Sequence, residues 1–175
     1  MIYAKSFNYK KFVPQDFLNI LPEVECADRM TTYVCTKEDF VNINKVLGID
    51  YEIYSALYFC INPEGFNSIH NDNPANSASY PIIALNIPLV GCDDSVMYWY
   101  DSIDKSKETV MYGPSKQTPI PKLNFDNAIQ LSKRTINVPT FIRIDKWHNI
   151  YNYNKTMCAK MLSVRFKNHK YFKLS

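Results

Sequence analysis

Apolar and polar residues change their spacing near residue 50. Before that point, apolar positions recur at helical intervals over residues 40–47, directly after a Thr36–Asp39 segment that has the form of a capping box. Gly48 is the expected end of this helix. A shorter helix is predicted to begin at Pro14, and the residues before it predict an edge strand or an arm laid over the core.

Beyond residue 50 the chain consists of short apolar runs separated by turns rich in Pro, Gly and Asn. Strands are predicted at residues 53–61, 66–72, 81–90, 96–100, 109–112, 140–145 and 157–166, and residues 128–136 fit either a strand or a short helix. Many short strands without a strand–helix–strand rhythm are typical of a β-sandwich or barrel. Residues 115–127, interrupted by Pro119 and Pro121, predict a long loop, which we interpret as a lid or substrate loop.

Two histidines and one carboxylate stand out against this pattern. His70 and Asp72 are two residues apart, so in an extended segment both side chains point to the same side. His148 follows the predicted strand at 140–145, and the third histidine, His169, stands in a basic tail where we expect it to be solvated. Two histidines and one carboxylate on one face are the ligands of mononuclear non-haem Fe(II) oxygenases. The alternative is a polar loop in which His70 and Asp72 cap turns.

Composition limits the partners and the compartment. The net charge of this 175-residue chain is only +3 and its basic residues form no stripe, so no nucleic-acid partner is indicated. No signal peptide and no membrane-spanning apolar run are found, so no membrane partner is expected. The five cysteines have no regular spacing, and we therefore expect free thiols in a soluble cytoplasmic protein. The Asn, Ile, Lys and Tyr content is typical of AT-rich genomes such as those of viruses, in which case the compartment is the host cytoplasm.

The order of these segments resembles a known family. The turn Pro63-Glu64-Gly65 followed by Ile69-His70-Asn71-Asp72, the run 84–89 followed by Tyr98-Trp99-Tyr100, and the run 142–149 followed by 162–166 carry the resemblance. Together they are similar to the 2-oxoglutarate/Fe(II)-dependent dioxygenases, in particular to small phage and marine microbial members.

The resemblance implies a mainly β fold, a double-stranded β-helix of the jelly-roll, cupin-like type with two or so N-terminal helices. We expect one domain, 1–175, with an arm and helices at 1–50 packing on the barrel, a double-stranded β-helix core at 51–167 and a basic tail at 168–175. His70, Asp72 and His148 match the iron ligands of the family, and no catalytic residue beyond these ligands is predicted.

The co-substrate residues depart from the family pattern. The family places a basic residue on the closing strand, shortly after the distal histidine, to bind the distal carboxylate of 2-oxoglutarate. Cys158 and Ala159 occupy that region here. Arg165 is the preferred replacement because a guanidinium binds a carboxylate bidentately, and Lys160 is the second choice. Tyr58, on the first core strand, is a candidate hydroxyl donor to the co-substrate.

Three functional hypotheses follow. The first is an enzyme that binds Fe(II) and 2-oxoglutarate and hydroxylates a small-molecule or peptide substrate. The second is a non-catalytic jelly-roll protein with a structural or binding role. The third is a cupin-like metalloprotein that does not use 2-oxoglutarate.

Overall fold

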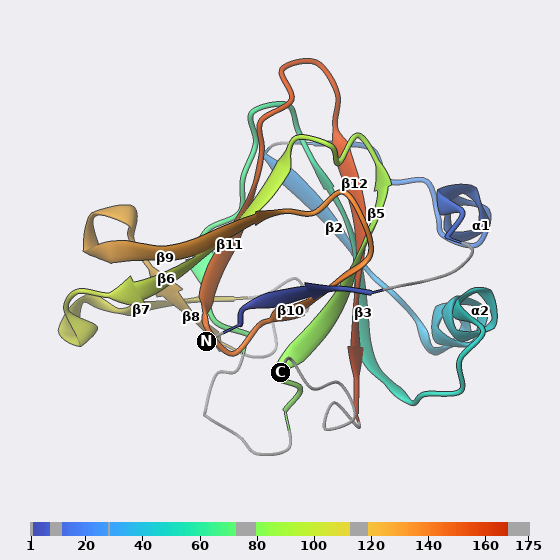
Figure 1. Cartoon of the computed structure of the whole chain (residues 1–175), viewed down its shortest axis with the longest axis horizontal. Coiled ribbons are helices and arrows are strands. Elements are labelled where there is room, and N and C mark those ends of the chain that lie inside the picture. The colour runs from blue at the N-terminus through green and yellow to red at the C-terminus, as the bar shows by residue number, and fades with distance from the viewer. Residues whose placement is uncertain (1, 8–11, 28, 73–79, 113–118, 168–175) are drawn as a thin grey trace.

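The computed structural model describes residues 2–7, 12–27, 29–72, 80–112 and 119–167. Its strands form two antiparallel sheets of six strands each (Figure 1). The first sheet has the order β1 (Ala4–Ser6), β10 (Thr140–Arg143), β5 (Ile83–Val90), β12 (Ala159–Phe166), β3 (Ile53–Ile61) and β2 (Met30–Val34). The second sheet has the order β7 (Thr109–Tyr112), β8 (Pro119–Leu123), β4 (Ile69–His70), β11 (Trp147–Asn152), β6 (Ser95–Ser102) and β9 (Ala128–Thr135).

The path of the chain between the sheets defines the fold class. Strands β3, β5, β10 and β12 lie side by side in the first sheet, and β4, β6, β9 and β11 lie side by side in the second. The chain therefore crosses from one sheet to the other at most of its turns, as it does in a jelly roll. The predicted mainly β, double-stranded β-helix fold with N-terminal helices is confirmed.

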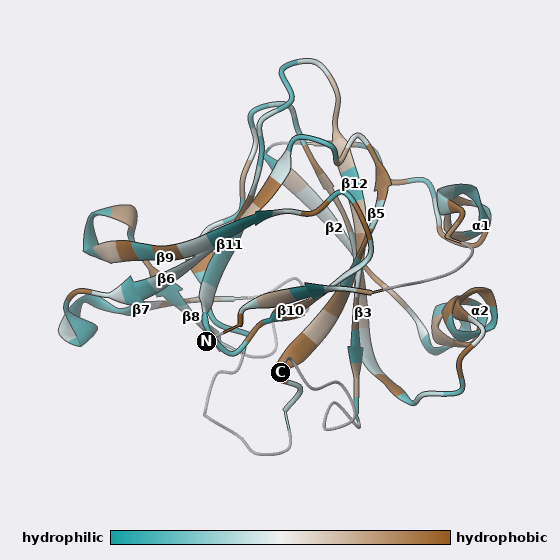
Figure 2. Ribbon diagram, in the orientation of Figure 1, coloured by the Kyte–Doolittle hydropathy of each residue, from teal (hydrophilic) through white to brown (hydrophobic). Residues whose placement is uncertain are grey.

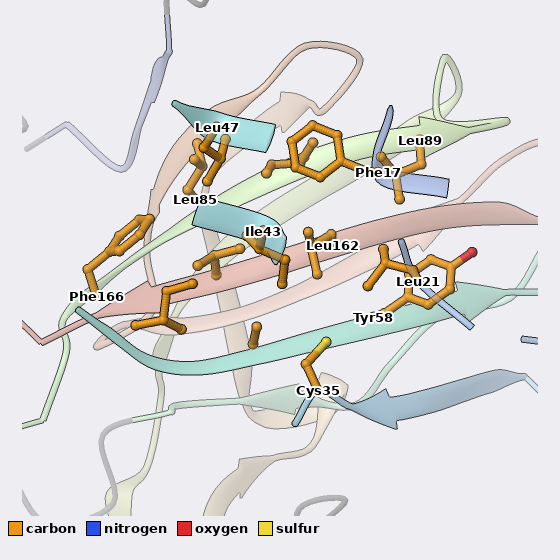
Figure 3. Close-up of a cluster of buried hydrophobic side chains, with 14 of the residues drawn as sticks. Phe17, Leu21, Cys35, Ile43, Leu47, Tyr58, Leu85, Leu89, Leu162 and Phe166 are labelled. Carbon is orange, nitrogen blue, oxygen red and sulfur yellow. The ribbon is translucent and has the colours of Figure 1, made fainter. Parts of the chain in front are cut away.

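Two helices cover the outer face of the first sheet (Figure 1). Helix α1 (Pro14–Leu18) begins at a proline, and helix α2 (Lys37–Leu47) begins at Thr36, which forms the predicted capping box with Asp39. Gly48 ends α2 in the left-handed conformation, with φ 63°, where a residue with a Cβ would be strained. Figure 2 shows that both helices carry hydrophobic and hydrophilic stretches, as amphipathic helices do. Their apolar side chains pack with those of the sheet in one buried cluster (Figure 3).

Strand β12 contributes side chains to two buried clusters, one under the helices and one between the two sheets. Leu162, Val164 and Phe166 face the helices, whereas the alternate residues Ala159 and Met161 belong to the cluster between the two sheets. Because both faces of β12 are covered, apolar residues stand on both of them and the pattern does not tell which face is the inner one. The structure places the odd-numbered residues inside.

Aromatic rings cover the outer face of the second sheet. Met97 and Trp99 point into the core between the sheets, so Tyr98 and Tyr100 lie on the opposite face of β6. A closed circuit of ring contacts, with centroids 4.3 to 6.5 Å apart, runs through Tyr98, Tyr100, Phe125, Phe66, Tyr151 and Tyr153. Stacked and edge-on rings stabilise each other, so these contacts link β6 and β11 to Phe66 and Phe125 on this face.

The predicted loop at 115–127 is wrong for its second half. Pro119–Leu123 form β8, and Phe125–Asn127 form a short 3-10 helix. The carbonyl of Pro121 points toward β4 and accepts from the backbone N–H of Asn71, so the side on which the proline lacks a donor faces a strand of only two residues. Prolines are tolerated in a strand where few donors are needed. The first part of the predicted loop, 115–118, lies outside the described residues, as do the loop at 73–79 and the basic tail.

Besides β8, two strands were not predicted as such. The strand predicted at 140–145 ends at Arg143, and His148 lies within a separate strand, β11. Strand β2, at Met30–Val34, was not predicted. Ala128–Thr135, for which a strand and a helix were both considered, is strand β9.

The expectation of five free thiols is wrong for Cys26 and Cys60, which form a disulfide, whereas Cys35, Cys92 and Cys158 are free. Sequence spacing did not reveal this pair because the two residues meet only when the segment before β2 lies along β3, with a Cα–Cα distance of 5.4 Å. Within the described part of the chain, none of the helices is long and apolar enough to cross a membrane.

The packing of α2 gives a stability prediction. Ile43 is fully buried under the helix, so Ile43→Ala should lower the free energy of unfolding by about 2 to 5 kcal/mol through the cavity that it leaves. Val41, on the same helix, is 68% exposed, and Val41→Ala should change it by less than about 0.5 kcal/mol. Urea unfolding measures both, and similar effects of the two substitutions would contradict the packing described here.

Candidate metal centre

Three side chains converge on the inner face of the second sheet. His70 on β4 and His148 on β11 are register partners, and their ring centroids are 4.5 Å apart. Asp72 lies two residues beyond His70, with its Oδ1 3.2 Å from His70 Nε2. One ligand atom from each of the three residues lies within 4.8 Å of the others. The structure therefore brings together the three residues that the sequence analysis singled out as candidate metal ligands.

Backbone carbonyls orient both imidazoles. His70 Nδ1 is 2.7 Å from the carbonyl oxygen of Ser68, and His148 Nδ1 is 2.7 Å from that of Lys146. A carbonyl oxygen can only accept, so each Nδ1 carries the proton and donates. With that proton on Nδ1, the neutral form of each ring has its lone pair on Nε2, the atom that a metal would bind, and second-shell hydrogen bonds of this kind orient metal-binding histidines.

Asp72 is held in a buried ion pair. Its Oδ2 accepts from Nη2 of Arg165 on β12, and the two residues are 5% and 6% exposed. Burial by itself raises the pKa of the Asp72 carboxyl, but the Arg165 guanidinium and the hydrogen bond from His70 outweigh it and hold that pKa well below its usual range. The carboxylate is therefore ionised at neutral pH.

The two histidines titrate in opposite directions. Burial lowers the pKa of both, and for His148 the nearby His70 lowers it further, to about 4. For His70 the hydrogen bond and the charge of Asp72 outweigh burial and raise the pKa. The contact with Asp72 Oδ1 explains the difference. A neutral imidazole at His148 and an anionic Asp72 are the protonation states that a divalent cation requires of its ligands.

An interior pocket opens beside the three residues. Its wall is largely apolar and includes Met30, Leu57, Phe59, Met97, Ile142 and Ile144. Asn86, Ser163 and Arg165 add polar groups from the first sheet, where Ser163 on β12 is the register partner of Asn86 on β5. Among the described residues, Asn86 Oδ1 and Arg165 Nε are buried without a hydrogen-bond partner. Buried polar atoms normally have partners, so these two are available to a bound molecule.

Sequence reasoning missed Asn86, although a signal was present. Asn86 lies inside the apolar run of β5 and is 2% exposed, and a polar residue in a buried strand indicates a special environment. Tyr80 was also missed. Burial raises the pKa of its hydroxyl, on which the charges of Arg165 and Asp72 act in opposite directions.

Two predicted co-substrate residues lie away from the site. Tyr58 is 1% exposed and packs on the helix-covered face of β3, where Figure 3 shows it with Leu21 and Leu162. Lys160 alternates with the inward residues of β12, and neither side chain lines the pocket. The alternation of strand side chains separates both from His70. Of the three candidates only Arg165 is brought to the triad.

No protein-family model matches the chain, and no curated protein matches its sequence. Among solved structures, it is similar to the viral collagen prolyl hydroxylase of Paramecium bursaria Chlorella virus-1 in its 2OG complex, with 10% identity and a TM-score of 0.45 over 94% of this chain and 95% of that one. It is also similar to the oxalate decarboxylase of Lactobacillus farciminis in a formate complex, with 15% identity and a TM-score of 0.38 over 86% of this chain. The chain spans only 32% of the length of the decarboxylase. Because these identities and TM-scores are low, function is inferred from the geometry of the site.

The low pKa of His148 predicts acid sensitivity. Its folded pKa of about 4 lies below the unfolded value of about 6.5, so the unfolded chain binds more protons between these values and stability falls as the pH falls. Between about pH 6.5 and about pH 4, the free energy of unfolding should drop by on the order of 2 to 3 kcal/mol more in the native protein than in His148→Gln, which has no such group. Urea unfolding in chelator-treated buffer measures this. Equal slopes for both proteins would show that His148 is not buried as a neutral imidazole.

Proposed function

We propose that this protein is a mononuclear non-haem Fe(II) oxygenase that uses 2-oxoglutarate and hydroxylates a small-molecule or peptide substrate. The observation that carries the proposal is the convergence of His70, Asp72 and His148 within 4.8 Å, beside an interior pocket. Two imidazoles and one carboxylate on one face of a metal leave its other positions open, which is the arrangement of this enzyme class.

The residues present fit such a cation. His70 and His148 would each offer Nε2, because the carbonyls of Ser68 and Lys146 already occupy both Nδ1 atoms. Asp72 would offer carboxylate oxygen, and Arg165 keeps that side chain ionised and oriented. When bound, Fe(II) with a 2-oxo acid supplies the activation of O2 that protein side chains cannot supply.

Arg165 is the residue proposed to hold the carboxylate of the co-substrate. It is the only lysine or arginine among the described residues that line the pocket. Nη2 is engaged by Asp72, whereas Nε has no partner among the described residues and can donate to an anion. Ser163 and Asn86 lie next along the same face and could bind neutral polar groups of the ligand. A guanidinium that keeps one edge for its structural partner can still bind a second carboxylate with its other N–H groups.

The apolar wall favours a substrate whose reacting part is uncharged. Methionine and isoleucine side chains make most of the wall, so the fit comes from shape and burial of apolar surface. An aliphatic carbon of a small molecule or of a peptide side chain fits this environment, since no charged group lines the wall apart from the triad and Arg165 within the described part of the pocket.

A second candidate is a cupin-like metalloenzyme that does not use 2-oxoglutarate. It is favoured by two features of β12. Arg165 already has an anionic partner in Asp72. The inward positions Ala159 and Met161, where a second basic side chain could have bound the co-substrate, are apolar. The two candidates share the metal ligands and differ in whether a dicarboxylate binds.

Anaerobic calorimetric titration of 2-oxoglutarate into Mn(II)-loaded protein separates them. We expect metal-dependent binding that Arg165→Met weakens by roughly 10- to 100-fold, because it removes charge-assisted hydrogen bonds. Lys160→Met is the matched control on the same strand. Since Lys160 does not line the pocket, the affinity of this variant for 2-oxoglutarate should stay within about twofold of that of the native protein.

Metal binding is measured separately on the same proteins. His70→Ala should lower the Mn(II) affinity by at least about 100-fold, because even outer-shell partners of a ligand matter by nearly that factor. Tight metal binding without 2-oxoglutarate binding would favour the cupin-like enzyme. If native protein bound neither, both enzyme proposals would fail and the non-catalytic jelly roll would stand.

A further inference from the structure

Three cysteine side chains meet on the opposite side of the first sheet from the pocket. The Sγ atoms of Cys26, Cys60 and Cys158 all lie within 4.8 Å of one another. Cys26 and Cys60 form a disulfide, and Cys158 is a free, partly exposed thiol. A free thiol beside a disulfide is the geometry that thiol–disulfide exchange requires.

The fold explains why they meet. Cys60 lies on β3 with its side chain in the helix-side core, and Cys26 and Cys158 pack against the same cluster. Strand β12 runs antiparallel to β3 with Lys160 opposite Cys60, so Cys158 is the diagonal neighbour of Cys60. Strand β2 lies on the other side of β3, and Cys26 precedes it. The cluster therefore joins three neighbouring segments of the sheet.

The other two free thiols, Cys35 and Cys92, differ from Cys158 in burial and in position. Cys35 and Cys92 are buried, and burial raises the pKa of the Cys35 thiol to about 12 and that of the Cys92 thiol to about 11. Neither belongs to the three-sulfur cluster. Cys158, in contrast, is partly exposed, and its S–H donates to Oδ1 of Asn62 over 3.4 Å, which holds the sulfur beside the disulfide. Exposure and position both favour Cys158 as the attacking group.

We propose that Cys26, Cys60 and Cys158 form a thiol–disulfide exchange site in which Cys158 attacks Cys60 and releases Cys26. The Cys158 thiol loses its proton, and its sulfur forms a bond to Cys60 Sγ while the Cys26–Cys60 bond breaks. The electron pair of that bond leaves on Cys26 Sγ, which takes up a proton. The number of thiols and disulfides is unchanged, so the step needs no oxidant or reductant.

Exchange would change which segments of the chain the disulfide links. In the structure the disulfide fixes the segment that leads into β2, and Met30 and Thr32 of β2 line the interior pocket. After exchange the covalent tie joins β3 to the start of β12, and Cys26 is a thiol that small thiols or a disulfide of another molecule can reach. The class of reagent that this site would take is therefore a thiol or a disulfide.

Slow alkylation of the unreduced protein with iodoacetamide, followed by non-reducing digestion and mass spectrometry, tests the exchange. We expect the label on both Cys26 and Cys158, together with linked peptides for Cys26–Cys60 and Cys60–Cys158. In Cys158→Ser the label on Cys26 should fall by at least about tenfold, since nothing displaces it. Buried Cys35 and Cys92 serve as internal controls that stay unlabelled while the protein is folded.

A second variant guards against a folding defect. Cys26→Ser, equilibrated with oxidised and reduced glutathione, should form the Cys60–Cys158 disulfide, because these two sulfurs remain within reach. Label confined to Cys158 in native protein, or a Cys26→Ser protein without the Cys60–Cys158 link, would overturn the proposal. Stoichiometric zinc with all three thiols protected from alkylation would also overturn it, in favour of a thiolate metal site.

Discussion

The buried ion pair between Asp72 and Arg165 is the contact on which the site depends. Each residue is less than a tenth exposed, and a single charge left without its partner in such a place costs several kcal/mol. Asp72 follows β4 of the second sheet, whereas Arg165 lies on β12 of the first, so the pair spans the interior between them. The backbone N–H of Asp72 also donates to the carbonyl of Ile144 at 2.9 Å. The carboxylate is thereby fixed from both sides, in position to meet the histidines.

The two sheets contribute to the site in different ways. The first sheet, packed between the helices and the interior, supplies Arg165 and, beside it, Ser163 and Asn86. Within it, β12 pairs with β3 on one side and with β5 on the other. The second sheet supplies the histidines through one pair of register partners. Strand β4 is only two residues long, and Asp72, two residues after His70, presents its carboxylate on the same side as the imidazole.

The features that the sequence predicted correctly are formed by residues close together in the chain. The capping box at Thr36, the apolar strand at 53–61 and the spacing of His70 and Asp72 were readable because each involves neighbours in the chain. The disulfide, the strand character of Pro119–Leu123 and the role of Asn86 depend on partners distant in sequence. Lys160 and Arg165 show the limit most clearly. Both lie on a strand that is buried on both faces. The alternation of apolar residues therefore does not show which of the two basic side chains points toward the candidate metal ligands.

The shared guanidinium has a consequence for the proposed enzyme. A divalent cation on Asp72 would draw on the same carboxylate charge that now stabilises Arg165, and would lie close enough to repel it. A carboxylate ligand at Arg165 Nε would restore the lost negative charge, so each ligand should favour the binding of the other. Linkage makes this coupling reciprocal, and it requires no conformational change. Because Arg165 is the one guanidinium among the described residues of the pocket, its ion pair would couple the binding of metal and co-substrate in the proposed enzyme.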